Sequence, residues 1–376
     1  MKNSFIAAIS VFIGTCIGAG VLGIPYVASK AGFPLVLLYI IFLGATVLLL
    51  NLYLGEISLR TKGIHQLPGY AEKYLGKNAG KIMKYAAIFG IYAAIVAYLV
   101  GVGQSLSFLI FGNLSYSVYF GILFGLFMSV IIKKGIKSLK KYEKFGVGIV
   151  LALVTVIFCV FVDKVNMNNL NYINFNSFFL PFGVVLFALL SFFAVPEIAM
   201  VLKNDRKEMK KVLFIGSLIS IIVYALFAFV VAGFKGSLTP EVATLALGGV
   251  FIFLGMFTMF TAYLSLGNAL EQTFQFDEKY KKFSSWFFSA IIPVLIYVLV
   301  SFTNLFSFIK ILSIGGVVSG GIIAILILFM VKKAKLNGER KPEYKIPINW
   351  FLIFVITLVF VAGILREVFA IIMNFN

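Results

Sequence analysis

The chain has 376 residues, of which 61% are hydrophobic and 12% are charged, and its formal net charge is +18. Soluble domains are about 45–50% apolar and about 25% charged, so this composition excludes an ordinary soluble protein. Apolar runs of about 18 or more residues are typical of membrane-spanning helices, and we predict an all-α polytopic membrane protein with about eleven such spans. The predicted spans are residues 5–28, 34–59, 85–111, 117–132, 145–162, 178–202, 212–234, 246–270, 284–302, 307–331 and 348–372.

The basic residues are concentrated in alternate loops. With a cytoplasmic N-terminus, all but five of the 32 Lys and Arg residues lie on the inner side. The positive-inside rule explains this asymmetry, so no nucleic-acid partner is expected. It predicts a multi-pass protein of the cell membrane with the N-terminus inside and, because the number of spans is odd, the C-terminus outside. The five exceptions are Lys30, Lys164, Lys235, Lys310 and Arg366.

The first predicted span contains GTCIGAGVLGIP, residues 14–25, where glycines and a proline stand at membrane depth. These residues are poor helix formers, and irregular backbone survives there only when it lines a cavity or is buried in protein. The segment therefore predicts a broken helix. A close-packing face of small residues, Gly14-x-x-x-Gly18, is the alternative. Close packing is the preferred interpretation of SIGGVVSGGI, residues 313–322.

The loops are short. The segment 60–84 mixes apolar residues with lysines at a spacing that predicts a short amphipathic helix on the membrane surface. The Asn-rich loop 163–177 is either a lid or a plain connection. Cys16 and Cys159 lie within spans, so no disulfide framework is expected. The first apolar segment is too long for a cleaved signal peptide, and we expect it to be a span.

The sixth predicted span, PFGVVLFALLSFFAVPEIAMVL, is interrupted by Pro196 and Glu197. The two interrupted spans are five apart, so they cross the membrane in opposite directions. This pattern predicts an inverted repeat with a substrate site between broken helices at the midplane. The halves would be residues 5–162 and 178–331, with an extra helix at 348–372. Free N–H groups of a broken helix bind a carboxylate, and free carbonyls bind an ammonium or a sodium ion.

Three stretches resemble the amino acid/polyamine/organocation transporter superfamily, in particular its amino acid/auxin permease branch, which includes bacterial tyrosine and tryptophan permeases. They are VFIGTCIGAGVLGIPYVASKAGF (11–33), LPGYAEKYLGKNAGK (67–81) and SFFAVPEIAMVLKNDRKEMKKVLFIGSLI (191–219). The resemblance implies the leucine-transporter fold, a 5+5 inverted repeat with broken first and sixth helices, and alternating access.

The resemblance also implies roles for individual residues. The substrate carboxylate would bind the backbone around five residues of the first span: Thr15, Cys16, Gly18, Ala19 and Gly20. Carbonyls near Ser191, Phe192 and Ala194 would receive the ammonium group. Side-chain selectivity would come from the third, sixth, eighth and tenth spans, with these candidates: Tyr92, Tyr98, Phe192, Phe193 and Ser265.

The coupling ion is left open between sodium and a proton. By resemblance, a sodium ion would bind the carbonyls of Gly14, Ile17 and Thr258 and the hydroxyl of Thr261. Sodium-coupled members commonly have a second hydroxyl residue where this chain has Ala262. The lysine that some proton-coupled relatives carry on the fifth span is missing from residues 145–162. No other cofactor is expected.

Two of the acidic residues within spans are candidates for a role in gating, protonation or ion pairing. Because intramembrane acids are functional by default, Glu197 is a candidate for gating or protonation, with a salt-bridged residue at the inner end as the alternative. Glu56 stands one turn before Arg60, and we interpret the two as an i,i+4 ion pair.

The sequence contains no metal-binding Cys/His spacing and no phosphate-binding loop, so an enzyme or an ATP-driven pump is not expected. We predict a secondary active symporter of neutral, possibly aromatic, L-amino acids in a lipid bilayer. The alternatives are a transporter of a polyamine or another organic cation, and an amino acid sensor or channel with the same fold. The sequence predicts no oligomeric state.

Overall fold

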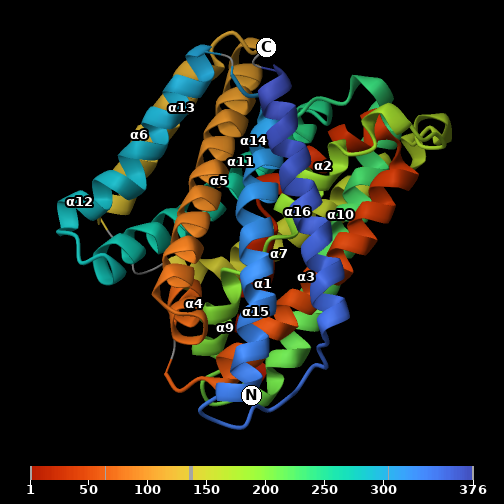
Figure 1. The fold of residues 1–376 in the computed structure, drawn as a ribbon. Coiled ribbons are helices and arrows are strands. Elements are labelled where there is room, and N and C mark those ends of the chain that lie inside the picture. Colours follow the sequence, from red (N-terminus) through yellow and green to blue (C-terminus); the bar gives the residue numbers. More distant parts are fainter. Residues whose placement is uncertain (1, 64, 135–138, 304, 375–376) are drawn as a thin grey trace.

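A computed structural model describes residues 2–63, 65–134, 139–303 and 305–374, and its regular structure over these ranges is helical (Figure 1). A helix suits an apolar chain in lipid because it satisfies backbone N–H and C=O groups within one segment. Among the described residues, ten helices are long and apolar enough to cross a membrane, and a bent pair raises the number of spans to eleven. The predicted all-α polytopic architecture is confirmed.

Several spans consist of two helical pieces. Pi-helical turns at Phe287–Ile291 and Gly315–Gly320 join such pieces in the ninth and tenth spans. In chain order, the spans are α1 (Lys2–Cys16) with α2 (Ala19–Ala31), α3 (Phe33–Arg60), α5 (Lys77–Phe111), α6 (Ser117–Lys134), α7 (Leu139–Phe161), α8 (Leu180–Leu189) with α9 (Ala194–Val201), α10 (Met209–Lys235), α11 (Gly249–Gln272), α12 (Lys282–Trp286) with α13 (Ile292–Thr303), α14 (Phe308–Ile314) with α15 (Gly321–Asn337), and α16 (Trp350–Asn374).

The short helix expected after the second span is α4 (Leu67–Leu75). Its apolar face contacts α5 and α15, and Leu67, Tyr70 and Tyr74 are buried there. The hydroxyls of Tyr74 and Thr61 lie 2.7 Å apart. The helix is therefore amphipathic as predicted, but its apolar side packs against protein where a membrane surface was expected.

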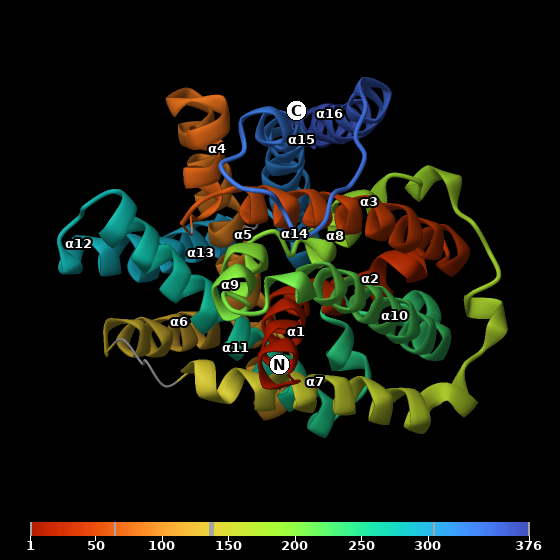
Figure 2. The same cartoon turned by 90° about the horizontal axis from the view of Figure 1, so that it is seen from below.

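The spans differ in how far they are enclosed by protein. In the most apolar window of α5, 72% of the residues are buried, whereas only 17% are buried in that of α16. Figures 1 and 2 agree with this difference, because α5 runs through the body of the bundle and α16 lies on its outside. The helices α6, α12 and α13 form an arm at one side of the molecule (Figures 1 and 2). The core thus lies around α1–α2, α5, α8 and α14–α15.

The first span breaks at Ile17 and Gly18, and its two halves are bent by 51°. The sixth span breaks at residues 190–193, between α8 and α9. Two details differ from the prediction. Pro25 stands inside α2 without ending it, and Pro196 lies after the break, in the first turn of α9. Proline is tolerated there because a first-turn N–H group has no intrahelical partner.

The two broken spans lie side by side and run in opposite directions. The first half of one contacts the second half of the other: α1 packs against α9, and α2 packs against α8. Gly20 makes the second contact close, because a Cβ at this position would lie 2.5 Å from the Cα of Ala188. The antiparallel crossing expected from the odd separation of the breaks is thus observed.

The glycine-rich segment of the tenth span is a packing surface, as predicted. A Cβ on Gly315 would lie 2.7 Å from the Cβ of Ala93, and one on Gly320 would lie 2.7 Å from Leu190. Larger side chains would separate this segment from α5 and from the end of α8.

The Asn-rich loop is fastened to the end of α2. Tyr172 donates a 2.6 Å hydrogen bond to the carbonyl of Ser29, and the N–H of Asn174 donates to the carbonyl of Ala31. Gly32, which follows α2, has a φ of 96° and lies so close to Tyr172 that a Cβ would overlap the carbonyl. Only glycine fits both conditions. The loop is therefore fixed to the junction between α2 and α3.

Candidate functional site

A small cavity lies where the two broken spans meet. Its walls come from α1, α2, α5, α8, α11, the break after α8, and the pi-helical segment of the tenth span, and its volume is about 40 Å³. Half of the residues predicted to bind substrate line it: Thr15, Cys16, Gly18, Gly20, Tyr98 and Phe193.

The N-terminus of α2 supplies backbone donors beside this cavity. The first N–H groups of a helix have no intrahelical partner and carry a partial positive charge. Gly18 is the residue before α2 and has no side chain to cap these groups. All the described residues that line the cavity are uncharged. Backbone groups are therefore the natural partners for the charged ends of a ligand in this cavity.

Tyr224 on α10 joins the two broken spans through its hydroxyl. The hydroxyl lies 2.7 Å from the carbonyl of Cys16 at the end of α1 and 2.7 Å from the carbonyl of Ala188 on α8, and these two acceptors share its single proton. The Cys16 thiol lies 3.4 Å from the same hydroxyl. Tyr224 is fully buried. Carbonyls freed by the helix ends thus receive a donor from a third helix, which fixes the two breaks relative to each other.

The second break is held from α3. Asn51 donates a 2.8 Å hydrogen bond to the hydroxyl of Ser191, which in turn donates to the carbonyl of Leu189 at 3.2 Å. Both polar side chains are buried. The side chain of Ser191 is therefore committed to supporting the unwound backbone, and its hydroxyl does not line the cavity.

Gly18 allows two neighbours to approach the first break. A Cβ there would lie 2.8 Å from the hydroxyl oxygen of Tyr98 and 3.5 Å from the Cβ of Ala262. The contact with Tyr98 brings α5 to the cavity. The contact with Ala262 brings the eighth span, α11, beside the unwound residues. A side chain at position 18 would displace the Tyr98 hydroxyl.

The other predicted substrate residues lie around the breaks without lining the cavity. Ala19, Phe192 and Ala194 are buried in the packing of the two breaks. The Tyr92 hydroxyl donates to the carbonyl of Phe288 at 2.7 Å. Ser265 is exposed on α11. The structure thus places Tyr92 and Ser265 away from the cavity.

The residues proposed for a coupling ion lie on α1, at its break and on α11, and these helices contact each other. Thr258 donates its hydroxyl proton to the carbonyl of Gly255, and Thr261 donates to the carbonyl of Thr258 at 3.0 Å. Both hydroxyl oxygens keep lone pairs. The predicted ligands are the carbonyls of Gly14, Ile17 and Thr258 and the hydroxyl of Thr261, which are all neutral oxygen atoms. A sodium site formed by them stays a prediction. Glu197 lies in the first turn of α9, half-buried.

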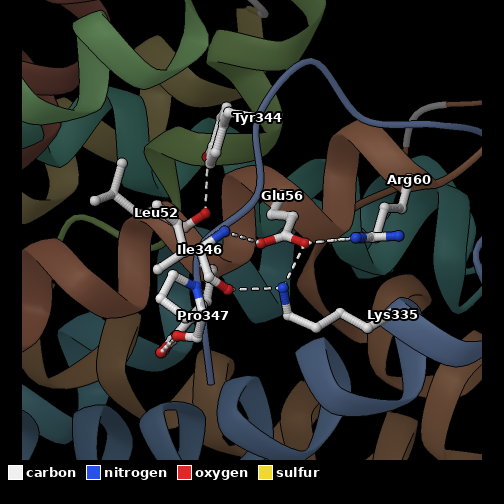
Figure 3. Close-up of polar contacts among 8 residues, drawn as sticks. Leu52, Glu56, Arg60, Lys335, Tyr344, Ile346 and Pro347 are labelled. Carbon is white, nitrogen blue, oxygen red and sulfur yellow. Dashed lines mark hydrogen bonds and ion pairs between the residues drawn. The ribbon is translucent and has the colours of Figure 1, made fainter. Parts of the chain in front are cut away.

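A second polar centre, the Glu56 cluster, lies at the end of α3 that faces α4. Glu56 is fully buried, and its carboxylate accepts hydrogen bonds from Arg60 (2.8 Å), from Lys335 on α15 (2.7 Å) and from the backbone N–H of Ile346 (2.8 Å). Lys335 also donates to the carbonyl of Ile346 at 2.7 Å. Figure 3 shows the carboxylate between the two cations and the backbone. The predicted i,i+4 pair is present, and it is part of a larger network.

The connection between α15 and α16 is bound along α3 by this network and its neighbours. Tyr344 donates to the carbonyl of Leu52 at 2.7 Å (Figure 3), and Tyr53 donates to the carbonyl of Pro347 at 2.8 Å. Burial, with the nearby charge of Glu56, raises the pKa of Tyr344 well above its usual value, so this donor stays neutral. A hydrogen bond from Lys73 lowers the pKa of Glu339, which therefore stays charged.

Sequence reasoning missed several residues that line the cavity: Gly90, Ile91, Ala94, Phe187, Leu190, Leu266 and Ser319. Most are apolar residues within apolar spans, and nothing in their local pattern distinguishes them from residues that face lipid. Ser319 carried a signal, since it is a polar residue inside a glycine-rich span. That segment was interpreted as packing alone.

The chain matches known transport proteins. The model of the tryptophan/tyrosine permease family matches residues 1–239, which include both broken spans. The chain is also similar to "Tyrosine-specific transport system 1" of Haemophilus influenzae, with 24% identity over 229 residues. The match covers 60% of this chain and 56% of that protein, so the chain spans little more than half the length of this relative. The family match extends over well over half of the sequence, and the chain therefore belongs to the tryptophan/tyrosine permease family.

Proposed function

We propose that this protein is a secondary active symporter that carries neutral aromatic L-amino acids across the cell membrane by alternating access. One observation carries the proposal: both broken spans border a single uncharged cavity, through Gly18 on one side and Leu190 and Phe193 on the other. Family membership supports a transporter over an enzyme. The tyrosine-specific system named above supports an aromatic substrate.

The substrate carboxylate would bind the free N–H groups at the start of α2, beside Gly18. The ammonium group would bind carbonyls at the second break, near Ser191. This assignment suits a zwitterion because the broken helices offer partial charges of both signs without placing full charges in the membrane.

Alternating access needs two packed units that move against each other around the site. The contacts support two related halves: the first and sixth spans touch, and so do the second and seventh (α3, α10), the third and eighth (α5, α11) and the fourth and ninth (α6, α13). This is the pairing that two inverted five-helix halves would make. The cavity of about 40 Å³ is far smaller than the ~300 Å³ of ordinary ligand pockets, so substrate entry requires the broken spans to separate.

The driving ion is a proton or sodium. Sodium is supported by the neutral oxygen donors of Thr258 and Thr261 on a helix that contacts α1. A proton is supported by the half-buried Glu197 just after the second break.

Two alternatives make different predictions. A polyamine or another organic cation calls for a carboxylate in the cavity, and none of the described lining residues is acidic. Glu197, the only candidate from the sequence, is not among them. A sensor would bind amino acid without net flux, and a channel would conduct without saturation.

Uptake by the purified protein in liposomes tests the proposal. We expect saturable accumulation of radiolabelled tyrosine against its gradient when an inward proton or sodium gradient is imposed, and no accumulation when the ion gradient is collapsed. Each ion is tested alone, so the same assay identifies the coupling ion. If neither gradient drives accumulation of any neutral amino acid, the symporter assignment is wrong.

A further inference from the structure

The hydroxyl of Ser319 is an unpaired polar group at the cavity. Ser319 is fully buried, and its Oγ has no hydrogen-bond partner. Several buried side-chain polar atoms in the described part of the chain have no partner. Of the residues that carry these atoms, Ser319 is the one that lines this cavity. An unpaired buried hydroxyl costs free energy, so its position at the cavity calls for an explanation.

The local backbone explains why Ser319 has no partner inside its own helix. A serine in an α-helix of an apolar span usually donates to the carbonyl four residues earlier. Ser105 on α5 (2.7 Å) and Ser220 on α10 (3.1 Å) do so in this protein. Ser319 stands in the pi-helical segment Gly315–Gly320, where the backbone pairs five residues apart. The wider turn moves the usual acceptor away, and pi-helical turns are frequent at functional sites.

The residues around Ser319 are small or apolar. Gly90 on α5 faces it so closely that a Cβ at this position would overlap Oγ. Phe187 and Phe193 line the same cavity with aromatic rings. The hydroxyl is therefore a side-chain hydrogen-bonding group in a mostly apolar pocket, on a different span from the backbone groups at the start of α2. This is the arrangement expected where a substrate side chain with an apolar ring and one polar atom binds.

We propose that Ser319 recognises the ring hydroxyl of the substrate and thereby selects tyrosine over phenylalanine. The proposal rests on the proposed function, because it places the amino acid in this cavity. In it, once the broken spans have separated to admit the substrate, the aromatic ring lies against Phe187 and Phe193. The Ser319 hydroxyl then forms the hydrogen bond that the protein itself does not provide. Phenylalanine leaves that hydroxyl unpaired, and a site built to pair with a substrate hydroxyl rejects the analogue that lacks it.

The test compares tyrosine and phenylalanine in the liposome assay. Wild-type protein should show a kcat/KM for tyrosine about tenfold or more above that for phenylalanine. Ser319→Ala should raise the KM for tyrosine about tenfold and leave that for phenylalanine within about twofold, so that the preference is largely lost. Gly90→Ala should also reduce the tyrosine preference, because its new methyl group displaces the Ser319 hydroxyl.

Ser217→Ala is the matched control. Ser217 is also a buried serine without a partner, but it lies on α10 and does not line the cavity. Its variant should keep the wild-type preference. The ratio of kcat/KM for tyrosine to that for phenylalanine is measured on the wild-type protein. An equal kcat/KM for the two amino acids would therefore overturn the proposal even if Ser319→Ala does not fold.

Two results would overturn the role of Ser319 while uptake itself persists: equal transport of both amino acids by the wild type, or an equal loss of both in Ser319→Ala. A wild-type protein that takes up no amino acid would instead refute the proposed function.

Discussion

The hydroxyl of Tyr224 lies between two carbonyls that belong to different broken helices, those of Cys16 and Ala188. Each carbonyl belongs to the last turn of its helix, and that of Cys16 also accepts a hydrogen bond from the N–H of Gly18 at 3.1 Å. A buried carbonyl without a donor is costly. A single tyrosine therefore supports both breaks, and its removal affects them together.

We expect Tyr224→Phe to lower the free energy of unfolding by about 1–2 kcal/mol, because two buried carbonyls lose the hydroxyl that they share. Thermal unfolding of purified protein in detergent measures the change. Tyr263→Phe is the control: Tyr263 is fully buried and its hydroxyl has no partner. Removal of the Tyr263 hydroxyl should leave the free energy of unfolding unchanged or raise it slightly. Equal destabilisation by the two variants would contradict the role given to Tyr224.

At the scale of elements, the Glu56 cluster connects α3, α15 and the segment that leads to α16. The carboxylate is fully buried and faces two cations. A buried charge is tolerated only when its partners are present, and removal of one partner leaves the others uncompensated. The network therefore holds the end of the tenth span to the second span.

Glu56→Gln should lower the free energy of unfolding by about 3 kcal/mol, since Arg60 and Lys335 then remain as unbalanced charges. Differential scanning fluorimetry at constant salt gives the shift. Glu343→Gln removes a carboxylate from the Arg340 pair, in which both side chains are about a quarter exposed. Its effect should be below about 1 kcal/mol. A Glu56→Gln protein as stable as Glu343→Gln would show that the network is not structural.

At the scale of the whole molecule, α1 begins at one end of the bundle and α16 ends at the opposite end (Figure 1). This agrees with an odd number of spans. The concentration of Lys and Arg in alternate loops predicts that the end that contains α4 faces the cytoplasm.

Cysteine labelling in cells tests this orientation. Lys77 and Asn113 flank the span α5 and are exposed. A membrane-impermeant maleimide should label Asn113→Cys in intact cells and should label Lys77→Cys only after permeabilisation. Cys16 is buried in the wild type and Cys159 is exposed on α7, so the unsubstituted protein gives the background. The reverse pattern would invert the topology, and labelling of both sites in intact cells would contradict α5 as a span.

Local sequence was a good guide to the spans and to the first break. The spans follow from long apolar runs, since lipid leaves the backbone no partner but its own helix. Ile17 and Gly18 are unwound within a run of glycines. The second break was placed too late, at Pro196, because proline looks like a helix breaker, whereas the first turn of a helix accepts it.

The sequence by itself thus determined that the chain crosses the membrane many times, where its first helix breaks, and that the two broken spans run in opposite directions. Only the tertiary structure decided which side chains meet at the breaks. Lys335 reaches Glu56 from 279 positions away, and Tyr224 reaches Cys16 from 208. Ser319 lines the cavity from within a pi-helical turn. In a span whose lipid-facing and protein-facing sides are both apolar, hydropathy does not mark the inward face. Helix rotation and packing between distant segments decide it.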